Sequence, residues 1–351
     1  MAFTTIAKPS VHFDVPTWDG SNSTTTITGM GFKPDALWIK RYDGSGHPVF
    51  NNSTQGTAKN WIPSGQNTVD TTVYVASYTS DGFTLTGNVN NTNDASQEYV
   101  AACWKANGGT TASNSDGATT STVQANTTSG FSVVTYTGTG SATTLGHGLG
   151  AVPKTIFTKS MDTADYGGYG NGSTLYYTDP WTDCLEVASN GSTWTDYDLF
   201  WNDTAPTSTV FSVKSHNTTN KSGDDYVAYC FAEVQGFSKF GFYTGTGNAR
   251  GTKVYCGFRP KWVFIKNATS AENWFSKQTG LTGYGYGGEK TRTVKYDTNT
   301  SSTNCTVNFE SNGFRPTTTD HKANGDDVKY IYMAFAEMPM VGTNGTIALA
   351  I

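Results

Sequence analysis

The sequence contains little charge. Asp, Glu, Lys and Arg make up 15% of the 351 residues, against about 25% in typical soluble domains. The formal net charge of -5 leaves no basic excess that would attract phosphate, so we expect no nucleic-acid partner. Solubility must come instead from Ser, Thr, Asn and Gly, which recur in runs typical of turn-rich β structure exposed to water.

The sequence also lacks the cysteine and histidine patterns of disulfide frameworks and metal sites. Its five cysteines are an odd number without CxxC or zinc-type spacing, and its histidines form no H-x-H or H-E-x-x-H pattern. We therefore predict buried thiols, no metal site and no cofactor. The cysteines are Cys103, Cys184, Cys230, Cys256 and Cys305.

Long hydrophobic runs and helical periodicity are missing as well. No stretch approaches the 18 or so apolar residues that cross a bilayer, and the opening MAFTTIAKPSVHF has no basic or apolar region of an export signal. We therefore expect no membrane insertion. Many short β-branched and aromatic runs are broken by Gly, Asn and Asp, whereas no long segment has apolar residues at i, i+3, i+4 and i+7. This pattern predicts an all-β fold.

What the sequence does contain is a pattern that recurs three times. The apolar octets YVAACWKA, YVAYCFAE and YIYMAFAE begin at Tyr99, Tyr226 and Tyr330. Each unit also has a tight turn, a proline 16 or 17 residues later and a lysine six positions after the proline. Agreement of several anchors in the same order predicts an internal repeat. The turns open at Trp18, Tyr136 and Tyr243, the prolines are Pro34, Pro153 and Pro260, and the lysines are Lys40, Lys159 and Lys266.

The repeat divides the chain into three predicted domains. Units of about 105 residues with short strands and frequent turns are typical of antiparallel β-sandwiches, here of jelly-roll type. We expect three such domains in tandem, each with a separate core, at residues 1–108, 130–236 and 237–341. Residues 109–129 are low in complexity and predict a flexible linker or an extended surface strap. Residues 342–351 form a C-terminal tail.

The octet at Tyr226 has two different faces when read as a strand. Val227, Tyr229 and Phe231 fall on one face, and Ala228 and Cys230 lie with Tyr226 on the other. The first face is predicted to be the core side, and the small residues of the second let a neighbouring layer approach. Burial on both faces predicts a central strand with a structural role.

The motifs YTGTG, GFRPKWVFIK, SNGFR and YIYMAFAE resemble a repeat domain of unknown function found in virion proteins of marine and environmental bacteriophages, often tail-fibre-like or appendage proteins. The likeness is clearest over residues 130–341 and weaker in the first unit. It implies a virion protein made in the host cytoplasm, assembled as a homo-oligomer, with a trimer among the options, and in contact with other virion proteins. It brings no catalytic residues.

Each candidate catalytic or metal-binding residue can also be explained by a structural role. His147 lies among glycines, but the corresponding residues Met30 and Cys256 indicate a semi-buried packing position. Glu233 and Glu337 fall one per domain, whereas glycoside hydrolysis needs two carboxylates in one cleft. The pairs Asp224–Asp225 and Asp326–Asp327 could hold calcium, yet no full ligand loop is present. We predict no catalytic residues and no enzyme activity.

Two loops place tyrosines among glycines at the middle of the second and third units. Such rings could project and stack on sugars, or they could pack across a subunit interface or cover their own loop. These candidate carbohydrate-binding residues are Tyr166, Tyr169, Tyr284 and Tyr286.

The sequence as a whole predicts a non-enzymatic bacteriophage structural protein, a tail-fibre or appendage component with a role in attachment to host-surface glycan. One alternative is a capsid head-decoration or head-fibre protein that stabilises the shell. A polysaccharide depolymerase is the alternative with least support, because no acids cluster.

Overall fold

The computed structural model describes residues 4–64, 69–162, 173–177, 183–187, 191–193, 195, 197–281, 292–298, 303–304 and 306–339. These residues are almost all strands and connecting turns, with a single turn of 3-10 helix, η1 (Pro9–Val11), and a short α-helix, α1 (Asp198–Trp201). The all-β prediction is confirmed. In the described part of the chain, no helix has the length and apolar character needed to cross a membrane.

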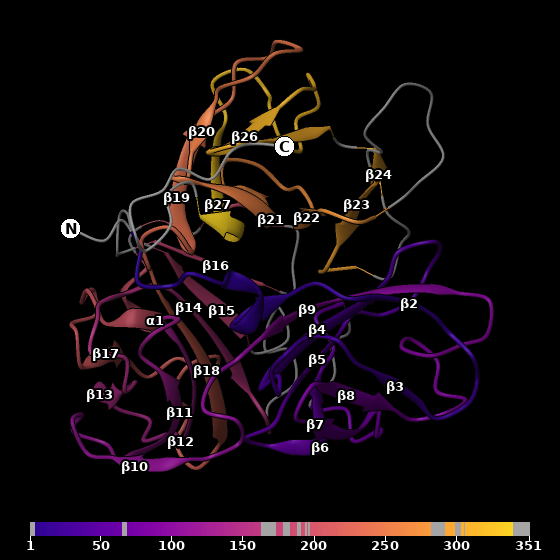
Figure 1. Cartoon of the computed structure of the whole chain (residues 1–351). Helices are drawn as coiled ribbons and strands as arrows, with labels where there is room; N and C mark the ends of the chain where they lie inside the picture. The colour runs from indigo at the N-terminus through magenta and orange to yellow at the C-terminus, as the bar shows by residue number, and fades with distance from the viewer. Residues whose placement is uncertain are drawn as a thin grey trace.

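Three large antiparallel sheets follow one another along the chain and form three lobes (Figure 1). The first has the order β1-β9-β4-β5-β6 with β2 also on β9, the second β10-β11-β12-β18-β14-β15-β16, and the third β19-β27-β21-β22-β23-β24. The strands of the first are β1 (Phe13–Asp14), β2 (Thr17–Asp19), β4 (Ala36–Arg41), β5 (Val49–Asn52), β6 (Gly56–Trp61) and β9 (Glu98–Trp104). Those of the second are β10 (Ala112–Asn114), β11 (Ser121–Asn126), β12 (Phe131–Thr137), β14 (Pro153–Ser160), β15 (Ser173–Tyr177), β16 (Cys184–Leu185) and β18 (Asp225–Ala232). Those of the third are β19 (Ser238–Thr244), β21 (Phe258–Asn267), β22 (Phe275–Gln278), β23 (Arg292–Lys295), β24 (Thr303–Asn304) and β27 (Lys329–Pro339).

A small sheet packs against each large one. Buried clusters join the small sheets to the large sheets, with Phe83, Phe211 and Phe314 as the corresponding aromatic residues of the small sheets. Each of these buried clusters therefore lies between a small sheet and a large sheet. The small sheets consist of β3 (Thr25–Ile27), β7 (Val75–Thr79) and β8 (Gly82–Leu85); of β13 (Thr143–Gly146) and β17 (Val210–Val213); and of β20 (Val254–Tyr255), β25 (Val307–Glu310) and β26 (Gly313–Pro316).

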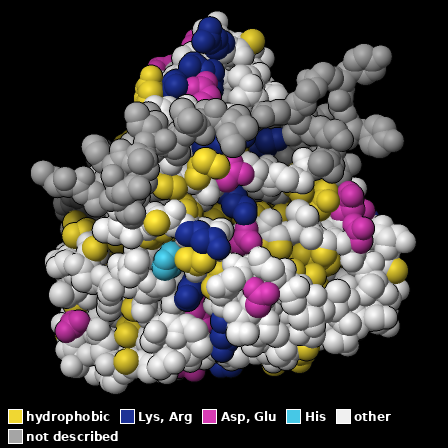
Figure 2. All heavy atoms as spheres, viewed as in Figure 1, with side chains coloured by type: hydrophobic (Ala, Val, Ile, Leu, Met, Phe, Trp, Pro, Cys, Tyr) yellow, Lys and Arg dark blue, Asp and Glu magenta, His cyan; other side chains and the backbone are white. Residues whose placement is uncertain are grey.

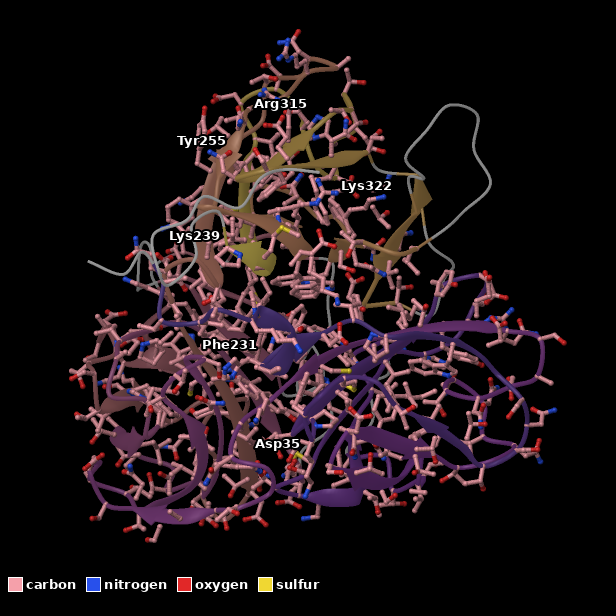
Figure 3. All side chains as sticks on the ribbon, viewed as in Figure 1. Asp35, Phe231, Lys239, Tyr255, Arg315 and Lys322 are labelled. Atoms are coloured by element: carbon pink, nitrogen blue, oxygen red, sulfur yellow. The ribbon has the colours of Figure 1, made fainter. Side chains whose placement is uncertain are left out.

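The opposite faces of the three large sheets meet in one further cluster, here called the shared core. Trp104, Phe231 and Phe335 stand at corresponding positions of β9, β18 and β27, and their ring centroids are 5.8, 5.9 and 6.1 Å apart pairwise. Figure 3 shows Phe231 close to the meeting point of the lobes. Near-equal distances among three corresponding rings give the centre of the molecule an approximate threefold arrangement.

The shared core revises the expectation of three separate cores. Val227, Tyr229 and Phe231 do line a core, but that core is shared by all three sheets, whereas Ala228 and Cys230 face the local cluster of the second lobe. The octets are central strands, as predicted, because β9, β18 and β27 each have neighbours on both sides.

Of the two alternatives for residues 109–129, a flexible linker or an extended surface strap, the structure has an extended segment at the edge of the second sheet. These residues contain β10 and β11, and β11 pairs with β12 over five residues from Thr122 to Asn126. Gln124, within this polar stretch, is fully buried. Backbone pairing with the second sheet therefore orders a segment that has few apolar side chains of its own.

The N-terminal segment joins the first lobe to the third. Phe13 stacks on Phe335 with ring centroids 4.6 Å apart, and Asp14 forms an ion pair with Lys261. The segment assigned to the first domain therefore also packs against the third sheet, closing contacts among the three lobes.

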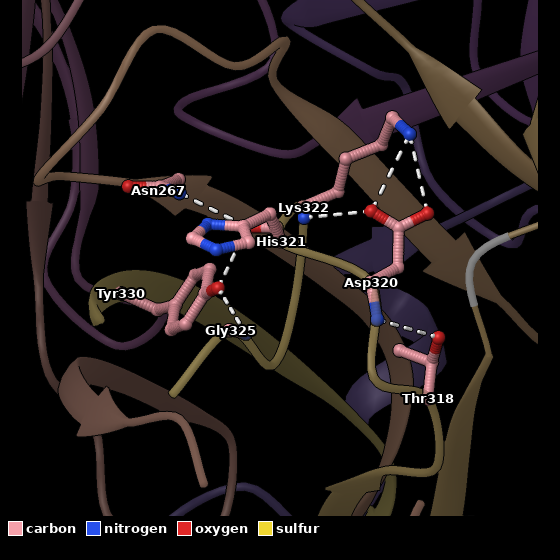
Figure 4. A network of polar contacts seen from close by, with 7 residues as sticks. All are labelled: Asn267, Thr318, Asp320, His321, Lys322, Gly325 and Tyr330. Atoms are coloured by element: carbon pink, nitrogen blue, oxygen red, sulfur yellow. Dashed lines mark hydrogen bonds and ion pairs between the residues drawn. The ribbon is translucent and has the colours of Figure 1, made fainter. Parts of the chain in front are cut away.

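The anchor residues of the repeat hold each turn against the loop before the central strand. The anchor rings stack in pairs: Trp18 on Tyr99 at 5.8 Å, Tyr136 on Tyr226 at 5.1 Å and Tyr243 on Tyr330 at 4.9 Å. The Tyr330 hydroxyl donates to the His321 carbonyl oxygen at 2.6 Å and accepts from the Gly325 N–H at 2.7 Å (Figure 4).

The loop before the central strand of the third lobe approaches the turn so closely that a Cβ on Gly245 would lie 2.1 Å from the Gly325 carbonyl oxygen. The turn therefore requires glycine at this position. Pro34 precedes β4, Pro153 opens β14, and Pro260 lies near the start of β21.

Candidate functional site

His147 is enclosed by its own lobe. Its side chain is fully buried, its Nε2 lies 3.2 Å from the Thr207 carbonyl oxygen, and its Nδ1 accepts from the Leu149 N–H at 3.2 Å. Burial lowers the pKa of the imidazole. The corresponding residues Met30 and Cys256 are buried as well, so the position is a packing position, more buried than predicted.

The two glutamates at the strand ends each have a cation as partner. Glu233 accepts from Lys239 Nζ at 2.7 Å, and Glu337 accepts from Arg259 Nε at 2.8 Å. In this arrangement each acid forms a partly exposed ion pair at the end of its own strand. Such pairs contribute little to stability, typically about 0–1 kcal/mol.

The aspartate turns do not assemble a metal site within the described residues. Asp224 Oδ1 lies 3.2 Å from Lys221 Nζ, and no group of three or more His, Cys, Asp or Glu side chains there could hold an ion. Four of the predicted buried thiols, Cys103, Cys184, Cys230 and Cys256, are buried. Cys305 lies outside the described residues, as do the C-terminal tail and the candidate carbohydrate-binding residues Tyr166, Tyr169, Tyr284 and Tyr286.

The repeated lysines Lys40, Lys159 and Lys266 are fully buried. Each lies two residues beyond an aromatic residue of the shared core on the same strand, and therefore on the same face. Loss of solvation lowers the pKa of these amines to about 7, about 7 and about 8, respectively. Backbone carbonyl oxygens accept from them: Thr298 from Lys40 at 3.0 Å, Ser160 from Lys159, and Glu272 from Lys266 at 2.7 Å.

One buried acid lies near two of these lysines. Burial raises the pKa of Asp297 to about 6, while its charge favours the protonated forms of Lys40 and Lys266. Asp297 Oδ2 accepts from Asn273 Nδ2 at 3.1 Å and from the Trp274 N–H at 3.0 Å. Those two contacts lie within the third lobe, whereas the hydrogen bond from Lys40 to the Thr298 carbonyl oxygen links the first sheet to the third lobe, which is a structural role.

An open groove of about 430 Å³ lies between the first and second lobes. We call it the hydroxyl groove because six of its lining residues carry a Ser or Thr hydroxyl. Its lining is Thr54, Gln55, Lys59, Thr120, Ser121, Thr122, Thr135, Tyr136, Thr137, Asp225 and Tyr226.

One wall of the hydroxyl groove is the second sheet. Thr122 is opposite Thr135, and Thr137 is opposite Asp225. Residues opposite each other in an antiparallel pair point to the same side, and alternate residues share a face. This face carries Val133 and Phe131 into the shared core, so the groove lies where the same face continues beyond the core into solvent.

The other wall comes from the first lobe and is held by a buried polar network. Gln124 Nε2 donates to Thr54 Oγ1 at 2.7 Å and to Ser53 Oγ at 3.1 Å. Ser53 Oγ in turn donates to Asp35 Oδ1 at 2.7 Å, and Figure 3 places Asp35 between the first and second lobes. Asn52 Nδ2 donates to Gln55 Oε1 at 2.9 Å. The wall is therefore fixed before any ligand arrives.

The hydroxyl groove carries one charge of each sign on opposite walls. Lys59 and Asp225 are both exposed, and Asp225 Oδ1 accepts from Thr137 Oγ1 at 3.0 Å. The groove can donate and accept hydrogen bonds along its length, while its two charges balance. Sequence patterns could not indicate it, because its residues come from separate strands of two lobes and threonine is common throughout the chain.

Comparison with known protein families gives a match over nearly the whole chain. A family model described as a domain of unknown function (DUF7483) matches residues 8–339, a span that runs through all three large sheets as one unit. No curated protein and no solved structure shows a significant match. The chain therefore belongs to the DUF7483 family of domains of unknown function.

Proposed function

We propose that this chain is a non-enzymatic structural protein of a bacteriophage virion, a tail-fibre or appendage component made in the host cytoplasm. The motifs in YTGTG, GFRPKWVFIK and YIYMAFAE support the virion setting through their resemblance to phage proteins. The observation that carries a structural role is the shared core, which joins three sheets through closely packed aromatic rings.

We further propose that each large sheet with its small sheet is one β-sandwich repeat. Corresponding anchor pairs, central strands and buried lysines in the three lobes support this division. The DUF7483 match covers residues 8–339, a span that includes all three lobes.

Partners in this proposal are other copies of the chain, other virion proteins and host-surface glycan. Because the apolar faces of the large sheets are used inside the shared core, contacts between copies would use the outer surface. Figure 2 shows that one face of this surface consists mainly of uncharged groups, with Lys and Arg gathered along its middle and on the third lobe. A low-charge polar coat suits a particle released into water.

The test is to locate the protein in purified particles with a gold-labelled antibody and to measure its copy number. We expect label on the tail or an appendage at a low copy number. Label over the whole head at a high copy number would support shell decoration instead, and absence from particles would overturn the proposal. Cleavage of host polysaccharide by the purified protein would indicate a depolymerase.

A further inference from the structure

We infer that the hydroxyl groove is a binding site for uncharged carbohydrate. This inference deepens the proposed role in attachment and rests on it, but it places binding at the junction of the first and second lobes. It uses none of the four loop tyrosines.

The chemistry of the lining favours a polyol. A sugar hydroxyl both donates and accepts, so it pairs best with a surface that offers both functions. Thr122, Thr135 and Thr137 supply hydroxyls, while Gln55 supplies an amide. Asp225 Oδ1 already accepts from Thr137, and its Oδ2 has no hydrogen-bond partner among the described residues, which leaves one carboxylate oxygen for a ligand hydroxyl.

The charge and the volume of the hydroxyl groove further restrict the class of ligand that it could bind. Lys59 and Asp225 balance each other across the groove, so neither an anionic nor a cationic ligand gains from net charge. The volume of about 430 Å³ lies within the range of small-molecule sites, about 300–1,000 Å³. The wall around Thr54 and Gln55 is fixed by Gln124 and Asn52, and a fixed wall lowers the entropy lost on binding.

The junction of the second and third lobes has a much smaller cavity than the hydroxyl groove. There a cavity of about 10 Å³ is lined by Phe242 and other mostly apolar residues, with Lys154 and Thr155 among them. Phe242 pairs with Ile331 as Thr135 pairs with Val227, beside the matching tyrosine pairs. Thr135 therefore occupies the position that corresponds to Phe242, which lines the cavity at the second junction.

The correspondence between Thr135 and Phe242 suggests a substitution that should block ligand binding in the groove. Thr135→Phe introduces the residue of the sister position and should fill the hydroxyl groove without entering the shared core. Asp225→Asn keeps the shape but removes the charge. Thr26→Phe, at an exposed strand position of the first small sheet, is the matched control for a threonine-to-phenylalanine change on the surface.

The experiment applies the full-length protein to an array of neutral oligosaccharides, with carboxylated and sulfated oligosaccharides on the same array. We expect binding to neutral glycans that falls at least 10-fold with Thr135→Phe and several-fold with Asp225→Asn, and is unchanged by Thr26→Phe. Unfolding temperatures of all variants show that each is folded; if Thr135→Phe is not, Asp225→Asn decides the outcome.

Three outcomes would overturn the inference: no glycan is bound, only acidic glycans are bound, or binding survives in folded Thr135→Phe. Loss of binding in Tyr284→Ala/Tyr286→Ala with full binding in both groove variants would assign the activity to the loop instead. The virion proposal is judged separately by particle labelling. A protein found on particles with an inactive groove would retain the first proposal and lose the second.

Discussion

The buried lysines are the residues whose charge conflicts most with their surroundings. Burial favours the neutral form of an amine, and the carbonyl oxygens of Ser160 and Glu272 accept from Lys159 and Lys266. The pKa of the Lys159 amine falls from 10.5 to about 7. Between these two pH values the unfolded chain holds a proton that the folded chain has released. The free energy of unfolding should therefore rise with pH across this window.

We predict that Lys159→Met stabilises the protein by about 1–3 kcal/mol at pH 6, where the folded protein carries the buried charge. At pH 10 the wild-type amine is neutral in the folded state, so the gain should vanish or reverse through loss of the hydrogen bond to Ser160. Urea unfolding at the two pH values measures both differences. Lys154→Met, on the same strand but half-buried, should change little with pH. Equal effects of Lys159→Met at both pH values would contradict this account.

At the scale of the element, each central strand takes part in two cores. Trp104 contributes to the shared core and Cys103, its neighbour in β9, to the local cluster of the first lobe. Substitutions on the two faces of a central strand should therefore destabilise different parts of the molecule.

We predict that Trp104→Ala costs about 3–5 kcal/mol and speeds amide hydrogen exchange in β18 and β27 as well as in β9. Phe83→Ala, a fully buried change in the local cluster, should speed exchange chiefly in the first lobe. Hydrogen exchange followed by mass spectrometry measures the spread. If Trp104→Ala affects only the first lobe, the shared core does not couple the sheets.

Elements were predictable from the sequence where local patterns decide them. The octets and the glycine turns depend on alternation and turn chemistry, which a sequence displays, whereas the stacking of Tyr243 on Tyr330 brings together residues far apart in the chain. The strand β11 was not predictable, because its pairing with β12 comes from a partner rather than from its own side chains. The burial of Lys159 could not be predicted for a similar reason: its recurrence was visible, but lysine composition indicates exposure. The hydroxyl groove depends on how two lobes meet, which no local pattern records.

At the scale of the whole molecule, the shared core makes each lobe depend on the others. A lobe removed from the chain would expose the face that carries Phe131, Phe157 and Phe231, and exposed apolar patches of this kind promote association.

We predict that residues 109–236, expressed alone with their own β10 and β11, do not form a stable monomer. They should aggregate, or associate through the exposed face, whereas the full chain should unfold in one cooperative transition. Light scattering after size-exclusion chromatography gives the mass, and calorimetry gives the transition. A folded monomeric fragment with the thermal stability of the full chain would show that the lobes are independent.

The arrangement of three corresponding sheets in one polypeptide also sets the valency of the protein. Three identical chains would repeat every junction three times, but one chain can have threonine at one junction and phenylalanine at the next, as Thr135 and Phe242 show. Each chain would therefore bind one glycan at the junction of the first and second lobes. Firm attachment would then depend on avidity, which grows with the number of copies that a particle displays and with their spacing.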